Sequence, residues 1–487
     1  MDRTLLERAS SAAVFPSSRS HHVDAERPFA ERTASYIPNL NPLFDPVDSV
    51  SVECLQGNAS RLLTGYSEDI GPELPQSLVP AGSIRSSIIN LTTATLGVGT
   101  LAIPSAFANA GLVLSVGMLL IQAWLGFTSI KQLISSFNVL EKSGFEEVIM
   151  TLFGRRLAMI FEVSILFFCF GAAVAYHITI ADIGIAISTK LLCDYSDNPF
   201  IAAVFLGRPG FLCLVTSCIL LPLSLYKRIA ELRFTCLIGV CCVIGLVLVV
   251  CVEFYSQGLH PSIRDDWTSI LWPRGFRGVV SSLGIITFAF CSQPNVPTIF
   301  ADLHSKSIRR MNMAVSRALA LCVIVYLVIG TAGFLQWGPQ TSSSVIVNLQ
   351  PEFFQGKFLV LVGYLAMGVA VCMAFPLNIF PLKFTVEQLS VEMQVQNTEL
   401  IVRIATIITV LLSLTCAIFV PNISVIFDVV GVTAGAFICF ICPAGIFLRI
   451  LSLGGGTFHR RAIKAWIVLS CGIAVMTVGT VTSLGLL

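Results

Sequence analysis

Charged residues are scarce in this sequence. Only 12% of its 487 residues are charged and 55% are hydrophobic, whereas about 25% of the residues in a soluble domain are charged. A water-soluble fold would lack the polar surface it needs, so the composition indicates an integral membrane protein. The net charge of +2 provides no basic surface for nucleic acid, and we expect no nucleic-acid partner.

Cofactor and metal motifs are missing as well. The 16 cysteines lie mostly inside apolar runs such as 236–251 and lack the paired spacing of zinc sites. The "GVG" at 97–99 is not followed by a third glycine at the spacing of a nucleotide-binding loop. Paired Asp residues, His and Glu at metal-binding spacing, and Ser with a basic partner are not found in adjacent spans. We therefore expect no cofactor, no bound metal and no enzymatic activity.

Residues 1–82 differ in composition from the rest of the chain. They are polar, carry eleven acidic residues against six arginines, and contain no apolar run long enough for a signal peptide. Such a segment cannot bury a hydrophobic core. The sequence predicts a disordered cytoplasmic tail over 1–82 and a membrane domain over 83–487.

The rest of the sequence contains eleven apolar segments. Each is close to the roughly 20 residues that a helix needs to cross a bilayer. The segments are 84–108, 111–136, 157–187, 209–226, 233–255, 278–301, 313–336, 357–382, 402–420, 424–448 and 464–486. With the N-terminus in the cytoplasm, the inner loops hold 17 Lys and Arg and the outer loops hold six. The apolar segments predict an all-α membrane protein. The charge asymmetry supports a cytoplasmic N-terminus, and an odd number of spans then places the C-terminus outside the cell or in a lumen.

Two of these spans contain residues that interrupt a helix. Gly97 and Gly99 lie within the first span, and Pro294 and Pro297 lie within the sixth. Unpaired backbone groups cost several kcal/mol each in lipid, so an interruption needs protein, water or a ligand to pair them. A close helix crossing through small residues is the alternative explanation for the glycines.

The two interrupted spans are five spans apart. This spacing is typical of an inverted repeat in which broken helices meet at the membrane midplane. It predicts a first repeat over 84–255, a second repeat over 278–448 and one extra helix over 464–486.

Five stretches of the sequence match the motifs of one known family. They are "INLTTATLGVGTLAIPSAFANAGL" (89–112), "GAAVAYHITIADIG" (171–184), "FAFCSQPNVPTIFADL" (288–303), "AGFLQWG" (332–338) and "FPLNIFPLKF" (375–384). Over about residues 80–487 the chain resembles the amino acid/auxin permease family, nearest its branch of sodium-coupled neutral amino acid transporters and vacuolar relatives. The resemblance implies the fold of the amino acid-polyamine-organocation superfamily.

The same resemblance implies an activity and a location. The activity is amino acid transport by alternating access, either secondary active or facilitative. A non-transporting amino acid sensor that uses the same pocket is the alternative. Neutral and cationic amino acids both stay open as substrates, and the membrane is the plasma membrane or that of a vacuole or lysosome.

The resemblance and the interruptions together indicate substrate contacts. The backbone of 97–99 would bind the substrate carboxylate through its amides, since glycine allows a close approach. Residues 290–293 stand where the family's sixth span meets the substrate amino group and side chain, and Tyr176 occupies a third-span position that faces the site. The candidate contacts are Thr93, Gly97, Val98, Gly99, Thr100, Tyr176, Phe290, Ser292 and Gln293. Helix packing, a simple kink and a bond from Tyr176 to a neighbouring helix are the structural alternatives.

Ionisable residues within the spans are candidates for proton coupling, because they are costly in a bilayer. His177 titrates near neutrality and is the first candidate, and Asp428 is the second. Glu162 and Asp182 lie near helix ends, where headgroups or water also explain them.

Hard ligands for sodium are few. In similar sodium-coupled carriers the ion lies between the first and eighth spans and is held by oxygen atoms. The resemblance places Thr93 at the first-span ligand and Cys372 and Ala374 at the eighth-span ligands, and residues 357–384 contain no Ser or Thr. We therefore expect transport that does not need sodium and is driven by protons or by the substrate gradient.

Overall fold

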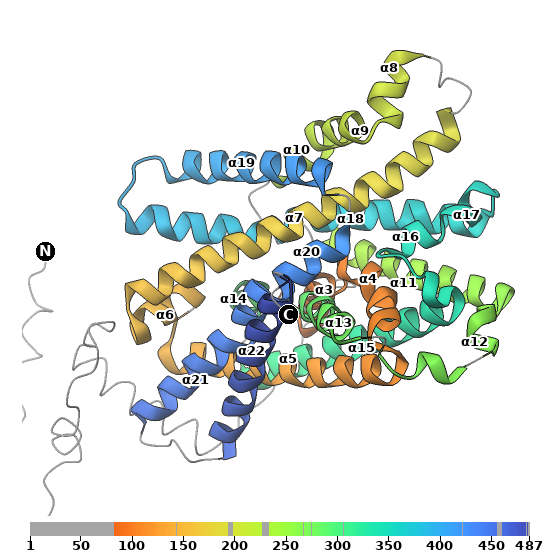
Figure 1. Cartoon of the computed structure of the whole chain (residues 1–487). Helices are drawn as coiled ribbons and strands as arrows, with labels where there is room; N and C mark the ends of the chain where they lie inside the picture. The colour runs from red at the N-terminus through yellow and green to blue at the C-terminus, as the bar shows by residue number, and fades with distance from the viewer. Residues whose placement is uncertain are drawn as a thin grey trace, which may run out of the picture. The chain divides into compact units, whose positions relative to one another are not determined.

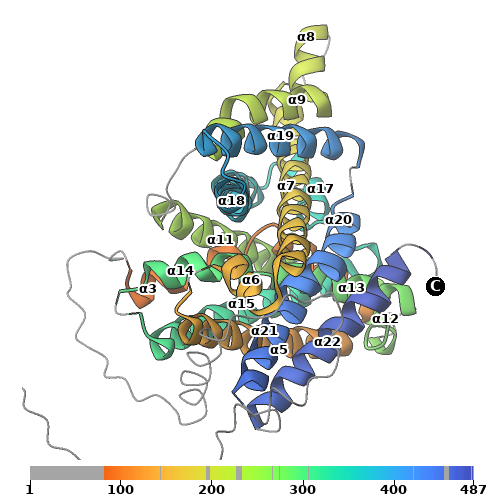
Figure 2. The ribbon, with the colours of Figure 1, turned by 90° about the vertical axis from the view of Figure 1, so that its left-hand side faces the viewer.

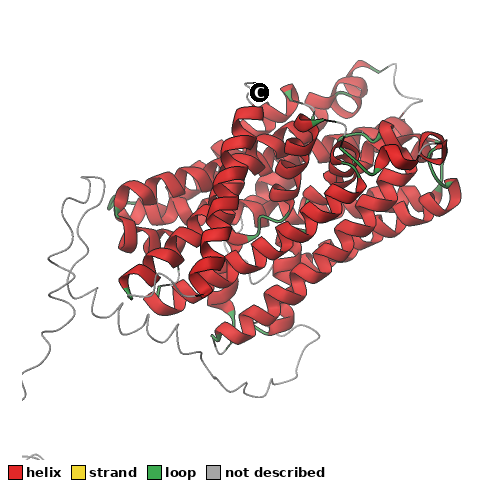
Figure 3. Ribbon diagram, turned by 60° about the horizontal axis from the view of Figure 1, so that its bottom comes forward, coloured by secondary structure: helices red, strands yellow, loops and turns green. Residues whose placement is uncertain are grey.

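The described part of the chain is helical throughout (Figure 3). The computed structural model describes residues 82–142, 144–192, 198–225, 233–265, 267–273, 275–304, 306–420, 422–454, 460–483 and 485. Every regular element within these ranges is a helix, as the sequence predicts. The predicted disorder of 1–82 falls, apart from Gly82, outside the described residues.

The helices range from single turns to 38 residues. In chain order the α-helices are α3 (Ile84–Thr95), α4 (Gly99–Ala110), α5 (Leu112–Leu140), α6 (Phe145–Phe153), α7 (Arg155–Leu192), α8 (Pro199–Ile201), α9 (Arg208–Val215), α10 (Leu221–Ser224), α11 (Arg233–Gln257), α12 (Pro261–Asp265), α13 (Phe276–Ala289), α14 (Val296–Asp302), α15 (Ile308–Trp337), α16 (Val345–Asn348), α17 (Gln350–Phe354), α18 (Phe358–Glu392), α19 (Thr398–Phe419), α20 (Ile423–Val430), α21 (Cys442–Leu453) and α22 (Arg460–Ser483). Wider π-helical turns occupy Ala202–Leu206, Thr216–Leu220, Gly431–Gly435 and Phe437–Ile441, and 3₁₀ turns occupy Trp267–Ile270, Gln293–Asn295 and Gly338–Gln340.

Nine helical segments of the described chain are long and apolar enough to cross a membrane. Two further pairs of helices pass the same test together, and each pair is bent at a short break. Counting each bent pair as one span gives eleven, the number that the sequence predicts. The first bent pair is α3 with α4, at 54°.

The second bent pair lies in the fourth span and is not predicted by the sequence. Pro199–Leu206 and Arg208–Ser224 meet at an angle of 66°, so this helical region begins ten residues before the predicted start at 209. Gly207 has an extended conformation between the two halves. Pro209, which has no amide to donate, follows at the start of the next helix.

The first span is interrupted at the predicted glycines. Helix α3 ends at Thr95 and α4 begins at Gly99. The Leu96 amide still donates to the Thr92 carbonyl, at 2.6 Å, and the Gly97 amide donates to the Thr95 carbonyl, at 2.9 Å. The regular helical pattern of hydrogen bonds therefore stops for three residues inside the apolar segment.

The sixth span is also interrupted. Helix α13 ends at Ala289, a 3₁₀ turn covers Gln293–Asn295, and α14 begins at Val296. Pro294 and Pro297 lie at the starts of the two later elements, where a missing amide costs least.

The two interruptions lie next to each other and both contact the seventh span. The Tyr326 hydroxyl of α15 lies 2.7 Å from the Thr95 carbonyl and 2.8 Å from the Ala289 carbonyl. These are the last residues of α3 and α13. Figure 1 shows α4 and α13 side by side, where the Ser282 hydroxyl donates to the Ala106 carbonyl at 2.8 Å. One buried tyrosine hydroxyl thus lies within hydrogen-bond distance of the last carbonyl before each break.

Helices α7 and α18 pack against each other beside this pair of interrupted helices (Figure 2). Both are long, with 38 and 35 residues. The Asn378 amide of α18 donates to the Cys169 carbonyl of α7 at 3.2 Å. Together, the two breaks and these two helices surround the site described next.

Candidate functional site

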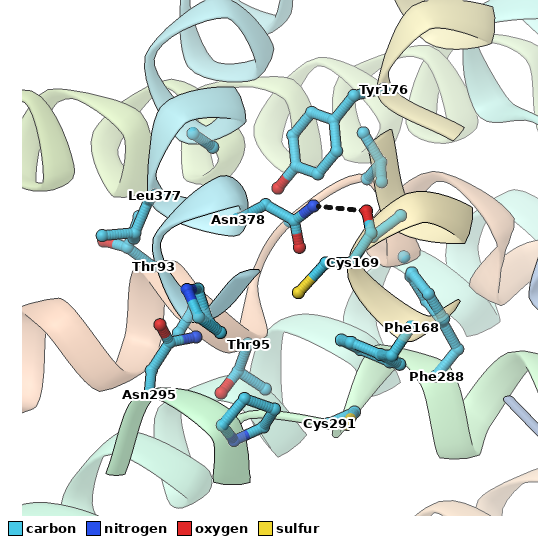
Figure 4. Close-up of a pocket in the computed structure, with 18 of the residues that line it drawn as sticks. Thr93, Thr95, Phe168, Cys169, Tyr176, Phe288, Cys291, Asn295, Leu377 and Asn378 are labelled. Carbon is cyan, nitrogen blue, oxygen red and sulfur yellow. Dashed lines mark hydrogen bonds between the residues drawn. The ribbon is translucent and has the colours of Figure 1, made fainter. Parts of the chain in front are cut away.

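A cavity lies where the two interruptions meet α7 and α18 (Figure 4). Its volume is about 40 Å³, more than the minimum that a single water molecule needs. Its lining consists of Thr93, Ala94, Thr95, Gly97, Val98, Gly99, Phe168, Cys169, Ala172, Tyr176, Phe288, Ala289, Cys291, Pro294, Asn295, Ala374, Leu377, Asn378 and Pro381. None of these residues is charged, so the cavity offers polarity only through amides, hydroxyls, thiols and backbone.

Two backbone amides of the first break are unpaired among the described residues. Among the described residues, the Val98 and Gly99 nitrogens have no hydrogen-bond acceptor, whereas the Gly97 nitrogen is bonded to the Thr95 carbonyl. Val98 caps α4 and Gly99 is its first residue. Unpaired amides and the positive end of a helix dipole both favour a carboxylate.

Gly97 and Gly99 lie too close to their neighbours for larger residues. A Cβ atom at Gly97 would lie 2.8 Å from the Tyr176 hydroxyl oxygen, and one at Gly99 would lie 3.0 Å from the Cα and Cβ of Ala289. Both glycines line the cavity. Their lack of a side chain therefore keeps the cavity open and also permits the contact between the first and sixth spans.

Tyr176 lies between the main cavity and a smaller one. The second cavity has a volume of about 10 Å³. The two cavities share Thr93, Gly97, Val98, Tyr176 and Ala374. The second extends instead to Gly239 and Val243 of α11 and to Met367, Ala370 and Val371 of α18. The Tyr176 ring, packed edge-on against Phe375 at 5.9 Å, thus separates two spaces along the same set of helices.

Asn378 is a cavity residue that the sequence analysis missed. Its nitrogen donates to the Cys169 carbonyl, and its oxygen points into the cavity (Figure 4). It is the only Asn or Gln in 357–384. A lone amide between Pro376 and Pro381 in an apolar span was the signal that could have identified it.

The predicted sixth-span residues lie next to the cavity lining. Phe290 packs edge-on against the Tyr326 ring at 5.2 Å, while Ser292 and Gln293 are fully buried. In their place, Ala289, Cys291, Pro294 and Asn295 line the cavity. Thr100, one residue beyond the free amides, is also buried outside the lining. The break contributes to the cavity, but through different residues of the same stretch.

The two candidates for proton coupling lie outside the cavity lining. His177 is fully buried, with Nδ1 2.9 Å from the Ala173 carbonyl and Nε2 3.2 Å from the Thr216 hydroxyl. A neutral ring that donates from Nδ1 and accepts at Nε2 satisfies both contacts. Asp428 packs against α13, where a Cβ at Gly284 would lie 2.8 Å from its Oδ1.

The two acidic residues of α7 have ionic partners. Glu162 pairs with Arg155 at 3.3 Å, and Asp182 pairs with Arg208 at 3.4 Å. Within the described ranges, no three His, Cys, Asp or Glu residues are grouped to hold a metal ion.

The chain belongs to the family of transmembrane amino acid transporter proteins, whose pattern matches residues 80–484. It is a multi-pass membrane protein of the branch that contains neutral and vacuolar amino acid transporters. The five quoted motifs had indicated this family, and the comparison confirms it.

Three relatives from different organisms illustrate the family. The chain is 25% identical to Solute carrier family 38 member 10 of Homo sapiens over 83% of its own length, but the match takes in only 35% of the human protein. It is 24% identical to Vacuolar amino acid transporter 7 of Saccharomyces cerevisiae, over 64% of this chain and 61% of that one. It is 25% identical to Sodium-coupled neutral amino acid transporter 7 of Xenopus laevis, over 87% and 93%.

Proposed function

We propose that this protein carries neutral amino acids across a membrane by alternating access, without a need for sodium. The observation that carries the proposal is the uncharged cavity at the two interruptions, with the free Val98 and Gly99 amides at its edge. These amides suit the carboxylate that every amino acid has. A cationic or anionic side chain would find no opposite charge in the lining, and burying an unpaired charge is costly.

An inverted repeat of five and five spans, followed by an extra helix, accounts for the arrangement of the breaks. The interruptions fall in the first and sixth spans, and the Tyr326 hydroxyl reaches the final residue of α3 and of α13. With the N-terminus in the cytoplasm, α3 begins at the cytoplasmic face. The membrane is that of a vacuole or lysosome or the plasma membrane, and the name of one relative, Vacuolar amino acid transporter 7, supports the first of these.

The test of transport is uptake of radiolabelled amino acids into proteoliposomes that contain the purified full-length protein. We expect neutral amino acids to accumulate above protein-free liposomes, and lysine and glutamate to stay at background. Saturable binding of a neutral amino acid without uptake would contradict transport and would favour the sensor.

Replacing sodium by choline at fixed pH should leave this uptake within about twofold of its original rate. Of the three aligned ligand positions, only Thr93 has a side-chain oxygen, and this Oγ1 lies 2.9 Å from the Ile89 carbonyl and 3.0 Å from the Cys236 carbonyl. Ala374, which lines both cavities, has no ligand to offer, and Cys372 offers only soft sulfur. A tenfold fall, about 1.4 kcal/mol of coupling, would contradict sodium independence.

Thiol modification should report on the cavity directly. Cys169 and Cys291 line it from α7 and from the sixth-span break (Figure 4). We expect methyl methanethiosulfonate to inhibit uptake, a transported amino acid to slow the inhibition, and the C169A/C291A double variant to resist the reagent. The matched control is C213A/C218A, because both of these cysteines are exposed outside the cavity; it should stay as sensitive as the wild type. Equal sensitivity of the two double variants would place the reactive thiols elsewhere.

A further inference from the structure

One buried carboxyl group on α6 has no role in the cavity. Glu146 lies in the first turn of α6, the short helix that joins α5 to α7, and only 7% of its surface is exposed. Helix α6 is anchored by Phe145, whose ring packs against Phe161 at 4.7 Å and edge-on against Phe137 at 5.8 Å. The carboxyl group is thus held in a packed junction rather than in water.

The Glu146 carboxylate contacts the end of α18 beyond the cavity. Its Oε1 accepts a hydrogen bond from the Thr385 hydroxyl at 2.9 Å. On α18, Asn378, Pro381 and Thr385 are separated by three and four residues and therefore share one face. Asn378 and Pro381 line the cavity. Thr385 continues that lining face towards the side of the membrane at which α3 begins.

Helix α7 continues its lining face in the same direction. Glu162 is seven residues before Cys169, two helical turns away, so the two share a face. Cys169 lines the cavity, and Glu162 is buried and paired with Arg155. Glu146 therefore lies beside the continuations of both helices that bound the cavity, bonded to Thr385 of α18 and close enough to Glu162 of α7 for their charges to interact.

The surroundings of Glu146 favour its neutral form. Burial raises the pKa of its carboxyl group above the usual range, and the negative charges of Glu162 and Glu147 raise it further, while hydrogen bonds from its own backbone and from Thr385 oppose the shift. The other helices packed against α6 each carry one basic residue, Lys131 on α5 and Arg449 on α21.

Helices α7 and α18, which contact α6, add further charged residues to the surroundings of Glu146. Near this end, α7 carries Arg155 and Arg156 besides Glu162, and α18 carries Lys383 and Glu387. A carboxyl group whose pKa is raised on docking binds a proton as it docks. Docking of α6 is therefore favoured at low pH and is weakened as the pH rises through the raised pKa.

We propose that Glu146 is a proton-binding site that holds α6 against α18 when protonated and releases it when ionised. Release of α6 exposes the Glu146 carboxylate to water and opens a route from the cavity between α7 and α18. Release of the proton thereby accompanies the opening of the cavity towards one side of the membrane. This inference rests on the proposed transport function, and it names a group that the sequence analysis did not consider.

Infrared difference spectroscopy of the purified full-length protein tests the proton site without any transport measurement. At a pH above the range in which exposed carboxylates titrate, we expect the wild type and Glu147→Gln to share a carbonyl band of a protonated carboxyl group that Glu146→Gln lacks in the variant-minus-wild-type difference spectrum. Glu147 is the matched control because it is the next residue and is only partly buried. A band that persists in Glu146→Gln, or that disappears in Glu147→Gln, would overturn the proposal.

The pH profile of uptake tests the coupling. Glu146→Gln should flatten the profile. Thr385→Val should move its midpoint up by about half a pH unit or more, because the lost hydrogen bond favoured the ionised form. Thr385→Ser keeps the hydroxyl and should restore the wild-type midpoint. An unchanged midpoint in Thr385→Val, or an equal shift in Thr385→Ser, would contradict a role for this bond.

The two measurements separate the possible failures. If the infrared band titrates in the wild type but no amino acid is taken up, the proton site stands and the transport proposal is wrong. If uptake is robust and Glu146→Gln changes neither the band nor the profile, the transport proposal stands and the proton site is wrong.

Discussion

Gly99→Leu should reduce amino acid uptake by at least tenfold, about 1.4 kcal/mol. A Cβ at this position already lies 3.0 Å from two atoms of Ala289, and leucine adds three further carbons. The side chain would push the first break away from the end of α13 and would cover the free amides of Val98 and Gly99. Overpacking of this kind typically costs about 1–3 kcal/mol.

Gly117→Leu is the matched control for this substitution. Gly117 lies in α5, and no atom lies within 4 Å of the position that its Cβ would take. This variant should retain near-normal uptake. The amount of each variant in the membrane and its melting temperature in detergent separate a blocked site from a misfolded protein. Near-normal uptake by folded Gly99→Leu would mean that the first break serves helix packing and not substrate binding.

Asn378→Asp should reduce uptake by tenfold or more. The Asn378 amide nitrogen donates to the Cys169 carbonyl, and an aspartate would turn this contact into a pair of acceptors. It would also bring a negative charge into a cavity whose lining has none, where it would repel the carboxylate of the substrate. Initial rates of uptake over a range of substrate concentrations would show the effect as a higher KM with a lower maximal rate.

Asn378→Leu separates the two causes. It loses the same hydrogen bond but adds no charge, so its uptake should fall less than that of Asn378→Asp. Raising the proportion of protonated aspartate by lowering the pH should partly rescue Asn378→Asp and should leave Asn378→Leu unaffected. Equal losses in the two variants at every pH would mean that charge in the cavity is unimportant.

The interruptions were predictable, but the side chains that they direct into the cavity were not. Gly97, Gly99, Pro294 and Pro297 break helices for local reasons, which hold wherever the segment lies. After a break the helical periodicity no longer relates one residue to the next. The sixth span therefore directs Cys291 to the cavity where the sequence analysis had placed its neighbours.

The rotation of α7 about its axis likewise decides which of two adjacent residues lines the cavity. Tyr176 and His177 are about 100° apart around a helix, so their side chains have different surroundings although both rings contact Phe375. Tyr176 lines the cavity, while His177 contacts Thr216. The sequence could propose both residues but could not choose between them.

The sequence by itself determined the membrane class, the apolar spans, the breaks in the first and sixth spans and the family, because apolar length, glycine, proline and short motifs are local properties of the chain. The tertiary structure alone decided which groups meet. Asn378 and Cys169 are 209 residues apart in the chain, and Glu146 and Thr385 are 239 residues apart. Such contacts depend on how each helix is rotated and where it crosses its neighbours. Many distant side chains set these two quantities together through packing, and no single segment encodes them.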